Sequence, residues 1–210
     1  MKEYHKIDTV FERDTNGSKK LIDGKFRDET VAFLANNEWV FTEKIDGTNI
    51  RVHWDGHDVT FGGRTDSAEI PKFLLSKLED IFLNEETEQL FEQVFGEKEV
   101  ILFGEGCGPK IQKGGGLYRS DVSFILFDVM VNDIYLRRMD VEAIAHMFGL
   151  DVVPIVLTGT IEDAITFVKS NPDSTLGTAK MEGVVGHPIV EIYDRCGKRV
   201  IVKIKVRDFN

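Results

Sequence analysis

The residues best suited to chemistry gather in the segment from Thr42 to Asn49, which reads T-E-K-I-D-G-T-N. A lysine amine can attack the α-phosphate of ATP and expel pyrophosphate, leaving a lysyl-AMP phosphoramide. A free lysine has a pKa of about 10.4, so at neutral pH it is protonated and inert. A desolvated site, a metal cation or a second lysine nearby would disfavour the ammonium form. Lys203 and Lys205 could supply that second lysine, and their i, i+2 spacing on a strand places both side chains on one face.

Four more motifs follow the K-x-D-G core of this segment. They read F-G-E-G at 103–106, I-L-F-D at 125–128, M-E-G-V-V at 181–185 and V-K-I-K at 202–205. K-x-D-G alone would occur by chance in many proteins, but five motifs in order, each on an expected strand or strand end, form a specific pattern. The set resembles the covalent nucleotidyltransferase superfamily, which holds DNA ligases, RNA ligases and mRNA capping enzymes. The resemblance runs from about Glu43 to Lys205, most of the chain.

The resemblance implies that ATP is the nucleotide cofactor and that Lys44 is the residue that carries AMP. Glu43 and the Lys44 backbone would flank the adenine, Phe127 would stack on it, and Glu105 would hydrogen-bond the ribose. Two of these side chains have simpler explanations. Phe127 could be a core residue because its strand is apolar, and Glu105 could cap a loop.

The resemblance also assigns the residues around the phosphates. Asn49 matches an asparagine that nick-sealing RNA ligases place near the phosphate, and Arg64 matches an arginine that contacts the nucleotide or the 5′-phosphate end. Glu182 matches the carboxylate that helps hold the catalytic metal. Magnesium suits that position because it binds carboxylate and phosphate oxygens together. Lys203 and Lys205 complete the catalytic and nucleotide-binding set and would neutralise phosphate oxygens.

Structural alternatives stand beside the other assignments. Without the later motifs, Lys44 would be a surface lysine beside a turn. Asp46 could serve only to shape the turn with Gly47, and Arg64 rests on looser spacing. The pair His53 and His57 is four residues apart, but in a strand and turn this is not the spacing of ligands on a helix, so we interpret both as solvated.

Three features favour an RNA ligase. The residues E-K-x-x-G-T-N at 43–49 look like the RNA ligase 2 family, which includes phage nick-sealing and kinetoplastid editing ligases, although Asp46 stands where that family often has histidine. The glycine-rich segment 106–116 looks like a loop of phage and bacterial RNA-ligase-like proteins, whose lysines could meet a nucleic-acid backbone; the alternative is a disordered surface loop. The chain also ends five residues after Lys205, where DNA ligases and capping enzymes usually continue into an OB-fold domain.

We therefore expect residues 1–210 to form a single adenylyltransferase domain with no C-terminal OB or helical domain. The expected function is that of an ATP-dependent RNA ligase, which joins 3′-hydroxyl and 5′-phosphate ends through a lysyl-AMP intermediate and an adenylylated 5′ end. Nick recognition would be weaker than in longer ligases unless a protein partner replaces the missing domain. The alternatives are an ATP-dependent DNA ligase, a capping guanylyltransferase and a non-catalytic module that binds nucleotide or RNA ends.

Composition limits how nucleic acid could be bound. The net charge of −10 argues against binding through the whole surface, so positive charge must be local. Two segments qualify, Lys110 to Arg119 and Lys198 to Arg207, whereas the acidic Glu79 to Glu99 is interpreted as a solvated helical face. No apolar run approaches the ~20 residues that cross a bilayer, and the N-terminus lacks a secretory apolar region. We expect a cytoplasmic monomer that acts on RNA or other nucleic-acid ends, with two free cysteines.

Hydrophobic periodicity predicts an α+β fold of antiparallel β-sheets flanked by helices. The resemblance implies that this fold is ATP-grasp-like. Strand, tight turn and strand are expected over Glu38 to Val52, and helices over Pro71 to Phe95, Met139 to Phe148 and Ile161 to Ser170. The remaining expected strands are Val59 to Phe61, Val100 to Phe103, Phe124 to Val131, Gly183 to Val185, Ile189 to Tyr193 and Arg199 to Val206.

Overall fold

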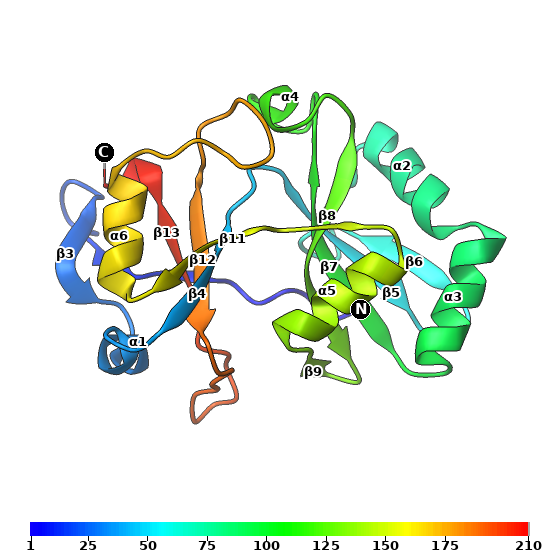
Figure 1. The fold of residues 1–210 in the computed structure, drawn as a ribbon, viewed down its shortest axis with the longest axis horizontal. Helices are drawn as coiled ribbons and strands as arrows, with labels where there is room; N and C mark the ends of the chain where they lie inside the picture. Colours follow the sequence, from blue (N-terminus) through cyan, green and yellow to red (C-terminus); the bar gives the residue numbers. More distant parts are fainter. Residues whose placement is uncertain (210) are drawn as a thin grey trace. The chain divides into compact units, whose positions relative to one another are not determined.

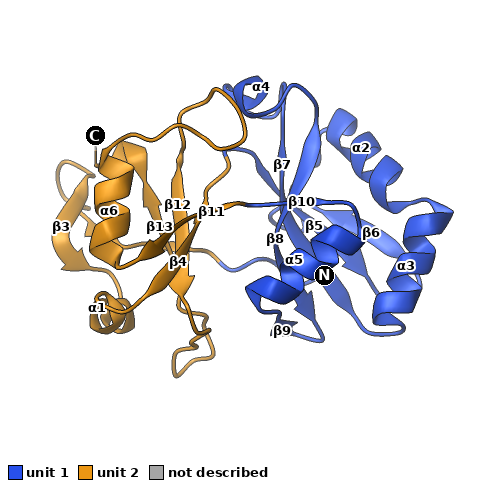
Figure 2. Cartoon of the chain, in the orientation of Figure 1, with its two compact units in different colours: residues 1–5, 46–153 blue, residues 6–45, 154–210 orange. Residues whose placement is uncertain are grey.

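The computed structural model describes residues 1–209. The chain divides into two compact units, coloured separately in Figure 2. Unit 1 comprises Met1–His5 with Asp46–Val153, and unit 2 comprises Lys6–Ile45 with Pro154–Asn210. The chain thus passes from unit 2 into unit 1 within the K-x-D-G segment, directly after Ile45.

Unit 1 is built on a six-stranded sheet in the order β10-β8-β7-β5-β6, with β9 paired to β8 (Figure 1). Its strands are β5 (Thr48–Trp54), β6 (Val59–Gly62), β7 (Val100–Cys107), β8 (Ser123–Val131), β9 (Ile134–Tyr135) and β10 (Asp151–Val152). Its helices are α2 (Lys72–Phe82), α3 (Glu85–Phe95), α4 (Gly115–Tyr118) and α5 (Arg138–Met147).

The main core of unit 1 lies between one face of this sheet and helices α2, α3 and α5. Because side chains alternate across a strand, Ile50, Val52 and Trp54 of β5 all point to this face. Neighbouring residues such as Asn49 and Arg51 point to the other face. The sheet therefore has one face covered by helices and a second face that is free to carry polar side chains.

Unit 2 is built on a five-stranded sheet in the order β1-β13-β12-β4-β11, with a separate β2-β3 pair. Its strands are β1 (Asp8–Thr9), β2 (Phe11–Arg13), β3 (Leu21–Phe26), β4 (Trp39–Glu43), β11 (Ile155–Gly159), β12 (Gly183–Pro188) and β13 (Val202–Lys205). Its helices are α1 (Glu29–Leu34), α6 (Ile161–Lys169) and the 3-10 turn η1 (Val206–Asp208). The buried side of α6 packs with Trp39, Phe41, Val184 and Ile204 of the sheet.

The predicted α+β class is confirmed, and most of the predicted elements are present. Helices α5 and α6 and strands β6, β8 and β12 form where expected. The helical region from Pro71 to Phe95 is two helices, because Asn84 ends one and caps the next by accepting from Thr87 N–H at 3.0 Å. Most strand pairs are antiparallel, but β1–β13 and β8–β10 are parallel, so the sheets are not purely antiparallel.

Two element predictions are wrong. Strands β4 and β5 do not form a hairpin about Asp46 and Gly47, because they belong to different sheets. Residues from Ile189 to Tyr193 form no strand and instead lead into a loop, which is held by hydrogen bonds between Arg199 and the Glu191 carboxylate at 2.6 and 2.7 Å. The acidic residues of α2 and α3 are exposed, as predicted. Within residues 1–209, no helix is long and apolar enough to cross a membrane.

The two cysteines should differ sharply in reactivity. Both are free; Cys107 is buried and Cys196 is exposed. Burial raises the pKa of the Cys107 thiol to about 11, so almost none of it is the reactive thiolate at neutral pH. We expect iodoacetamide at pH 7.5 to modify one thiol in the native protein and two in urea. Peptide mass mapping should assign the native label to Cys196, and equal labelling of both in the native state would contradict the buried position of Cys107.

Candidate active site

The strand order of unit 2 gathers residues from three of the sequence motifs. Lys44 directly follows β4, and its backbone N–H donates to the Gly183 carbonyl at 2.9 Å. Glu182 directly precedes β12, and Lys205 ends β13 opposite Gly183 in the antiparallel register. Since β12 lies between β4 and β13, motifs that are far apart in sequence meet at one end of the sheet.

The Glu182 carboxylate lies between two ammonium groups. Lys44 Nζ donates to Oε2 at 2.6 Å, and Lys205 Nζ donates to Oε1 at 2.5 Å. All three side chains are partly buried. Burial alone would raise the pKa of Glu182, but the charges and hydrogen bonds of Lys44 and Lys205 outweigh it and hold this pKa below its usual value. Glu182 is therefore an anion with both oxygens engaged.

Lys203 lies on the same face of β13 as Lys205. Val202 and Ile204 point into the core of unit 2, so the alternating lysines point to the opposite face, as their spacing predicts. Lys203 is opposite Val185 in the register, two pairs along the ladder from Gly183 and Lys205. This end of the sheet therefore carries three lysines and one glutamate, a net positive site suited to phosphate.

Glu43 is placed differently from its neighbour Lys44. It has the same strand parity as Trp39 and Phe41, so its side chain points to the core face and is only 1% exposed. Its carboxylate accepts from Ser174 Oγ at 2.5 Å, and from Thr175 N–H at 2.9 Å and Thr175 Oγ at 2.6 Å. The carboxylate thus anchors the loop that leads to Glu182. A position flanking adenine stays a prediction for this residue.

In unit 1, Asn49 and Glu105 are direct cross-strand partners on β5 and β7. The Asn49 side-chain oxygen is buried and accepts no hydrogen bond within residues 1–209, so a position near the phosphate stays a prediction for this residue. Gly47 allows this end of the sheet to close up, because a Cβ there would lie 2.3 Å from the Gly106 carbonyl oxygen and 2.8 Å from Glu105 Cγ. The glycine of K-x-D-G is therefore required by packing.

Phe127 lies outside the main core of unit 1. It packs with Phe103 and Tyr4 on the face of the sheet that the helices leave uncovered, with its ring 5.1 Å from Tyr4 and edge-on. The Tyr4 hydroxyl also donates to the neighbouring Asp128 carboxylate at 2.6 Å. The alternation of β7 places Glu105 and Phe103 on one face, so Phe127 shares a face with Glu105. Stacking on adenine stays a prediction.

Arg64 is exposed on the loop that follows β6. This loop is held by hydrogen bonds from Arg51, a buried arginine. Arg51 was not among the predicted site residues because it lies between two recognised motifs. Strand alternation places Arg51 on the same face as Asn49 and His53, so no signal in the sequence indicated that its guanidinium is buried. His57 is exposed as predicted, whereas His53 is partly buried and contacts Thr60 and Glu99.

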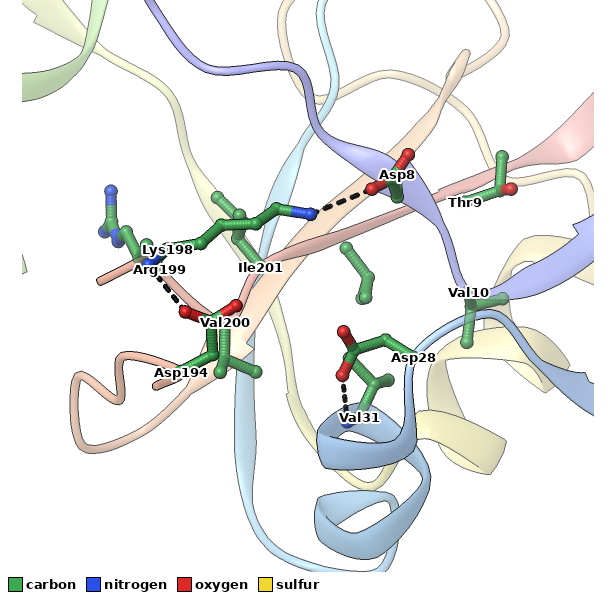
Figure 3. A pocket seen from close by; sticks show the side chains of 11 residues that line it. Asp8, Thr9, Val10, Asp28, Val31, Asp194, Lys198, Arg199, Val200 and Ile201 are labelled. Carbon is green, nitrogen blue, oxygen red and sulfur yellow. Dashed lines mark hydrogen bonds and ion pairs between the residues drawn. The ribbon is translucent and has the colours of Figure 1, made fainter. Parts of the chain in front are cut away.

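A separate hollow in unit 2 is drawn in Figure 3. It lies beside β1, α1 and the segment before β13, and contains none of the predicted site residues. Its charged groups already have partners: Lys198 donates to Asp8 at 2.9 Å, and Asp28 caps α1 through Thr30 and Val31 N–H. We therefore do not assign the site to this hollow.

The comparisons with known proteins identify the family. A family model described as RNA ligase matches residues 37–205, which is most of the chain. The chain therefore belongs to the RNA ligase family, within the nucleotidyltransferase superfamily. No curated protein matches the chain.

Solved structures with a similar fold include the RNA ligase of Naegleria gruberi. A mutant of that enzyme with ATP and Mn has a TM-score of 0.65 at 19% identity, over 94% of this chain and 55% of that one. The same enzyme with PPi has a TM-score of 0.63 at 19% identity, over 98% and 62%, respectively. A mutant with AMP and Mn has a TM-score of 0.63 at 18% identity, over 95% and 60%. At these identities the likeness establishes the fold, and this chain spans between 55% and 62% of the length of these structures.

Replacing Glu43 should destabilise the protein through the loop that it anchors. Glu43→Ala would leave the Ser174 hydroxyl and the Thr175 N–H without their buried acceptor, at a cost of about 3 kcal/mol in unfolding free energy. Glu43→Gln, which keeps one acceptor oxygen, should lose less. Urea denaturation measures both, with Glu92→Ala on the exposed face of α3 as the matched control. Equal stabilities of Glu43→Ala and the control would refute the anchoring role.

The ion pairs of Glu182 should make stability depend on acid pH. Its folded-state pKa lies below the unfolded value of about 4.5, so its contribution is fully present above that value and is lost as pH falls through the folded pKa. The difference in unfolding free energy between wild type and Glu182→Gln should therefore be constant from pH 7 to about pH 5 and shrink below it. Urea denaturation at each pH measures this difference, and a difference that stays constant down to pH 3 would contradict the ion pairs.

Proposed function

We propose that this chain is the adenylyltransferase domain of an ATP-dependent RNA ligase, and that Lys44 is its nucleophile. The observation that carries the proposal is the placement of Lys44 and Lys205 on the two oxygens of Glu182, beside Lys203. Membership of the RNA ligase family supports the substrate class. Complexes of the Naegleria gruberi RNA ligase with ATP, AMP and Mn support the choice of nucleotide and a divalent metal.

The first step transfers AMP to the protein. In the structure Lys44 donates to Glu182 as an ammonium, and an ammonium has no lone pair with which to attack. The amine must first give up a proton; its lone pair then bonds to the α-phosphorus of ATP as the bond to pyrophosphate breaks. Lys203 and Lys205 would stabilise the negative charge that builds up on the phosphate oxygens. The product is AMP joined to Lys44 Nζ.

Two further transfers complete the reaction. An oxygen of an RNA 5′-phosphate attacks the AMP phosphorus, the bond to Lys44 breaks, and the amine regains a proton. A 3′-hydroxyl then attacks the phosphate of the adenylylated end and releases AMP, leaving a phosphodiester bond. In unit 1, Glu105 and Asn49 would bind the ribose and phosphate regions, Phe127 the adenine, and Arg64 a phosphate.

The donor set fits a magnesium ion only in part. Within residues 1–209 no group of three or more His, Cys, Asp or Glu side chains could hold a metal, so Glu182 would be a single protein ligand. Phosphate oxygens and water would have to supply the other ligands, as is usual for magnesium in nucleotide sites. Bound there, the ion would neutralise phosphate charge. Lys44 must leave Glu182 Oε2 before that oxygen can serve as a ligand.

A non-catalytic module that binds nucleotide or RNA ends is the second candidate. Such a module needs no reactive amine, so the grouping of Lys44 and Lys205 on Glu182 favours the enzyme. We propose that residues 1–210 form a single adenylyltransferase domain. We also propose that it acts on RNA ends in preference to DNA ends. Sealing assays on nicked duplexes that differ only in the sugar at the 3′-hydroxyl or the 5′-phosphate side would assign the substrate.

Covalent labelling tests the proposed function directly. Incubation with magnesium and ATP labelled at the α-phosphate should give a radioactive protein band that survives denaturation, because the AMP is covalently bound. ATP labelled at the γ-phosphate should leave the protein unlabelled, because pyrophosphate departs. We expect Lys44→Arg to lower the amount of covalent label by at least about a thousandfold, since a guanidinium stays protonated.

The arginine variant is the matched control because it retains the positive charge beside Glu182. Its stability in urea should stay close to that of wild type, which separates loss of chemistry from loss of fold. A wild-type protein that binds ATP without covalent label would favour the non-catalytic module. Labelling by GTP in place of ATP would instead indicate a capping guanylyltransferase.

A further inference from the structure

Arg51 is a fully buried arginine in the middle of β5. Its side chain is 1% exposed, and its guanidinium makes three interactions with different parts of unit 1. Nε donates to the Gly63 carbonyl at 2.7 Å, one terminal nitrogen donates to the Met1 carbonyl at 3.1 Å, and the other donates to Asp66 Oδ1 at 2.9 Å. The bonds to Gly63 and Asp66 fall on either side of Arg64.

A buried guanidinium is costly, so its role needs an explanation. Removing this cation from water is unfavourable unless donors and charge are matched, and Asp66 is 75% exposed, so the ion pair itself gives little stability. An apolar residue in the same strand would pack without that cost. What the guanidinium offers is a rigid, planar set of donors that can hold two points of one loop at once.

The loop after β6 has room for the Arg51 guanidinium, which acts as a clamp by binding the loop at Gly63 and Asp66. A Cβ on Gly62 would lie 3.0 Å from an Arg51 terminal nitrogen, so the glycine leaves room for the guanidinium. Within the loop, Ala68 N–H donates to the Thr65 carbonyl at 3.1 Å, and Asp66 N–H donates to the Glu3 carboxylate at 3.2 Å. The backbone on both sides of Arg64 is therefore fixed.

Arg64 itself differs from the residues around it. Its side chain is exposed, and within residues 1–209 it makes no hydrogen bond or ion pair. An arginine on a mobile loop must lose backbone and side-chain freedom when it binds an anion, and fixing the backbone beforehand lowers that cost. The contacts of Arg51 hold the backbone of this loop and leave the Arg64 guanidinium exposed to bind an anion.

We propose that Arg51 is a positioning residue for phosphate binding: it clamps the loop at Gly63 and Asp66 so that Arg64 is held ready to pair with a phosphate group. This inference rests on the proposed function, which supplies the phosphate. The phosphate can be that of ATP or that of the RNA 5′ end, and two kinetic measurements distinguish them. One is the KM for ATP in protein adenylylation, and the other is the KM for a 5′-phosphorylated strand with enzyme already carrying AMP.

A double-mutant cycle tests the clamp. Asp66→Asn removes the ion pair at an exposed position and should raise one of the two KM values about two- to fivefold, with little change in kcat. Arg51→Met should raise the same KM about tenfold or more, and Arg51→Lys should recover part of the loss because lysine keeps the charge but not the planar donors. In an Arg64→Ala background, both the Asp66 and the Arg51 changes should have no further effect on that KM, because they act through Arg64.

Asp140→Asn is the matched control, since Asp140 also pairs with an arginine at an exposed position of unit 1, at 3.1 Å from Arg137. Its KM values should equal those of wild type. Clamp variants whose effects persist unchanged in the Arg64→Ala background would overturn the inference, as would clamp variants with wild-type KM values. If Arg51→Met fails to fold, the Asp66→Asn cycle alone decides. Absence of covalent label in the wild type would instead defeat the proposed function, whereas normal labelling with no KM effect of Arg64→Ala would defeat the clamp alone.

Discussion

A single carboxylate between two ammonium groups organises the site of unit 2. Lysines that converge on a partly buried position repel one another, and each loses hydration. Glu182 offsets both effects because each of its oxygens accepts from one lysine, from Lys44 at 2.6 Å and from Lys205 at 2.5 Å. The order β13-β12-β4 makes this possible, since it places the end of β4, the start of β12 and the end of β13 side by side. The chain thus forms a compact, net positive site in which Lys44 and Lys205 share one carboxylate.

The lysine site could be predicted from sequence because it depends on local alternation. Lys203 and Lys205 share a face for the same reason that Val202 and Ile204 share the core. The distant partners of Glu43 could not be predicted in this way. A motif match treats Glu43 and Lys44 as joint members of one site, yet strand alternation sends them to opposite faces, and the buried acceptor serves a loop more than 130 positions later. The sequence also could not decide the role of Asp46 and Gly47, because this dipeptide is compatible with a hairpin turn and with a connection between two sheets.

The elements that sequence reasoning missed are those that depend on distant partners. Strand β1 has two residues and is stabilised by parallel pairing with β13, nearly at the other end of the chain, so no local periodicity marks it. Strand β11 and helix α1 are short as well. The segment from Ile189 to Tyr193 shows the opposite error. Its apolar residues resemble a strand, but Ile189 and Val190 are exposed at 56% and 68%, and the bonds between Arg199 and Glu191 shape a loop.

The ion pair between Lys44 and Glu182 also gives the proposed reaction an order. In that reaction the Lys44 amine must attack phosphorus, so its hydrogen bond to Glu182 has to open first. Once the amine has bonded to phosphorus, Lys44 is no longer a cation and its attraction to Glu182 falls. Glu182 Oε2 then becomes available to a new partner, whereas Oε1 remains paired with Lys205. A neutral residue at position 182 could neither balance two lysines before the transfer nor respond to the loss of one charge after it.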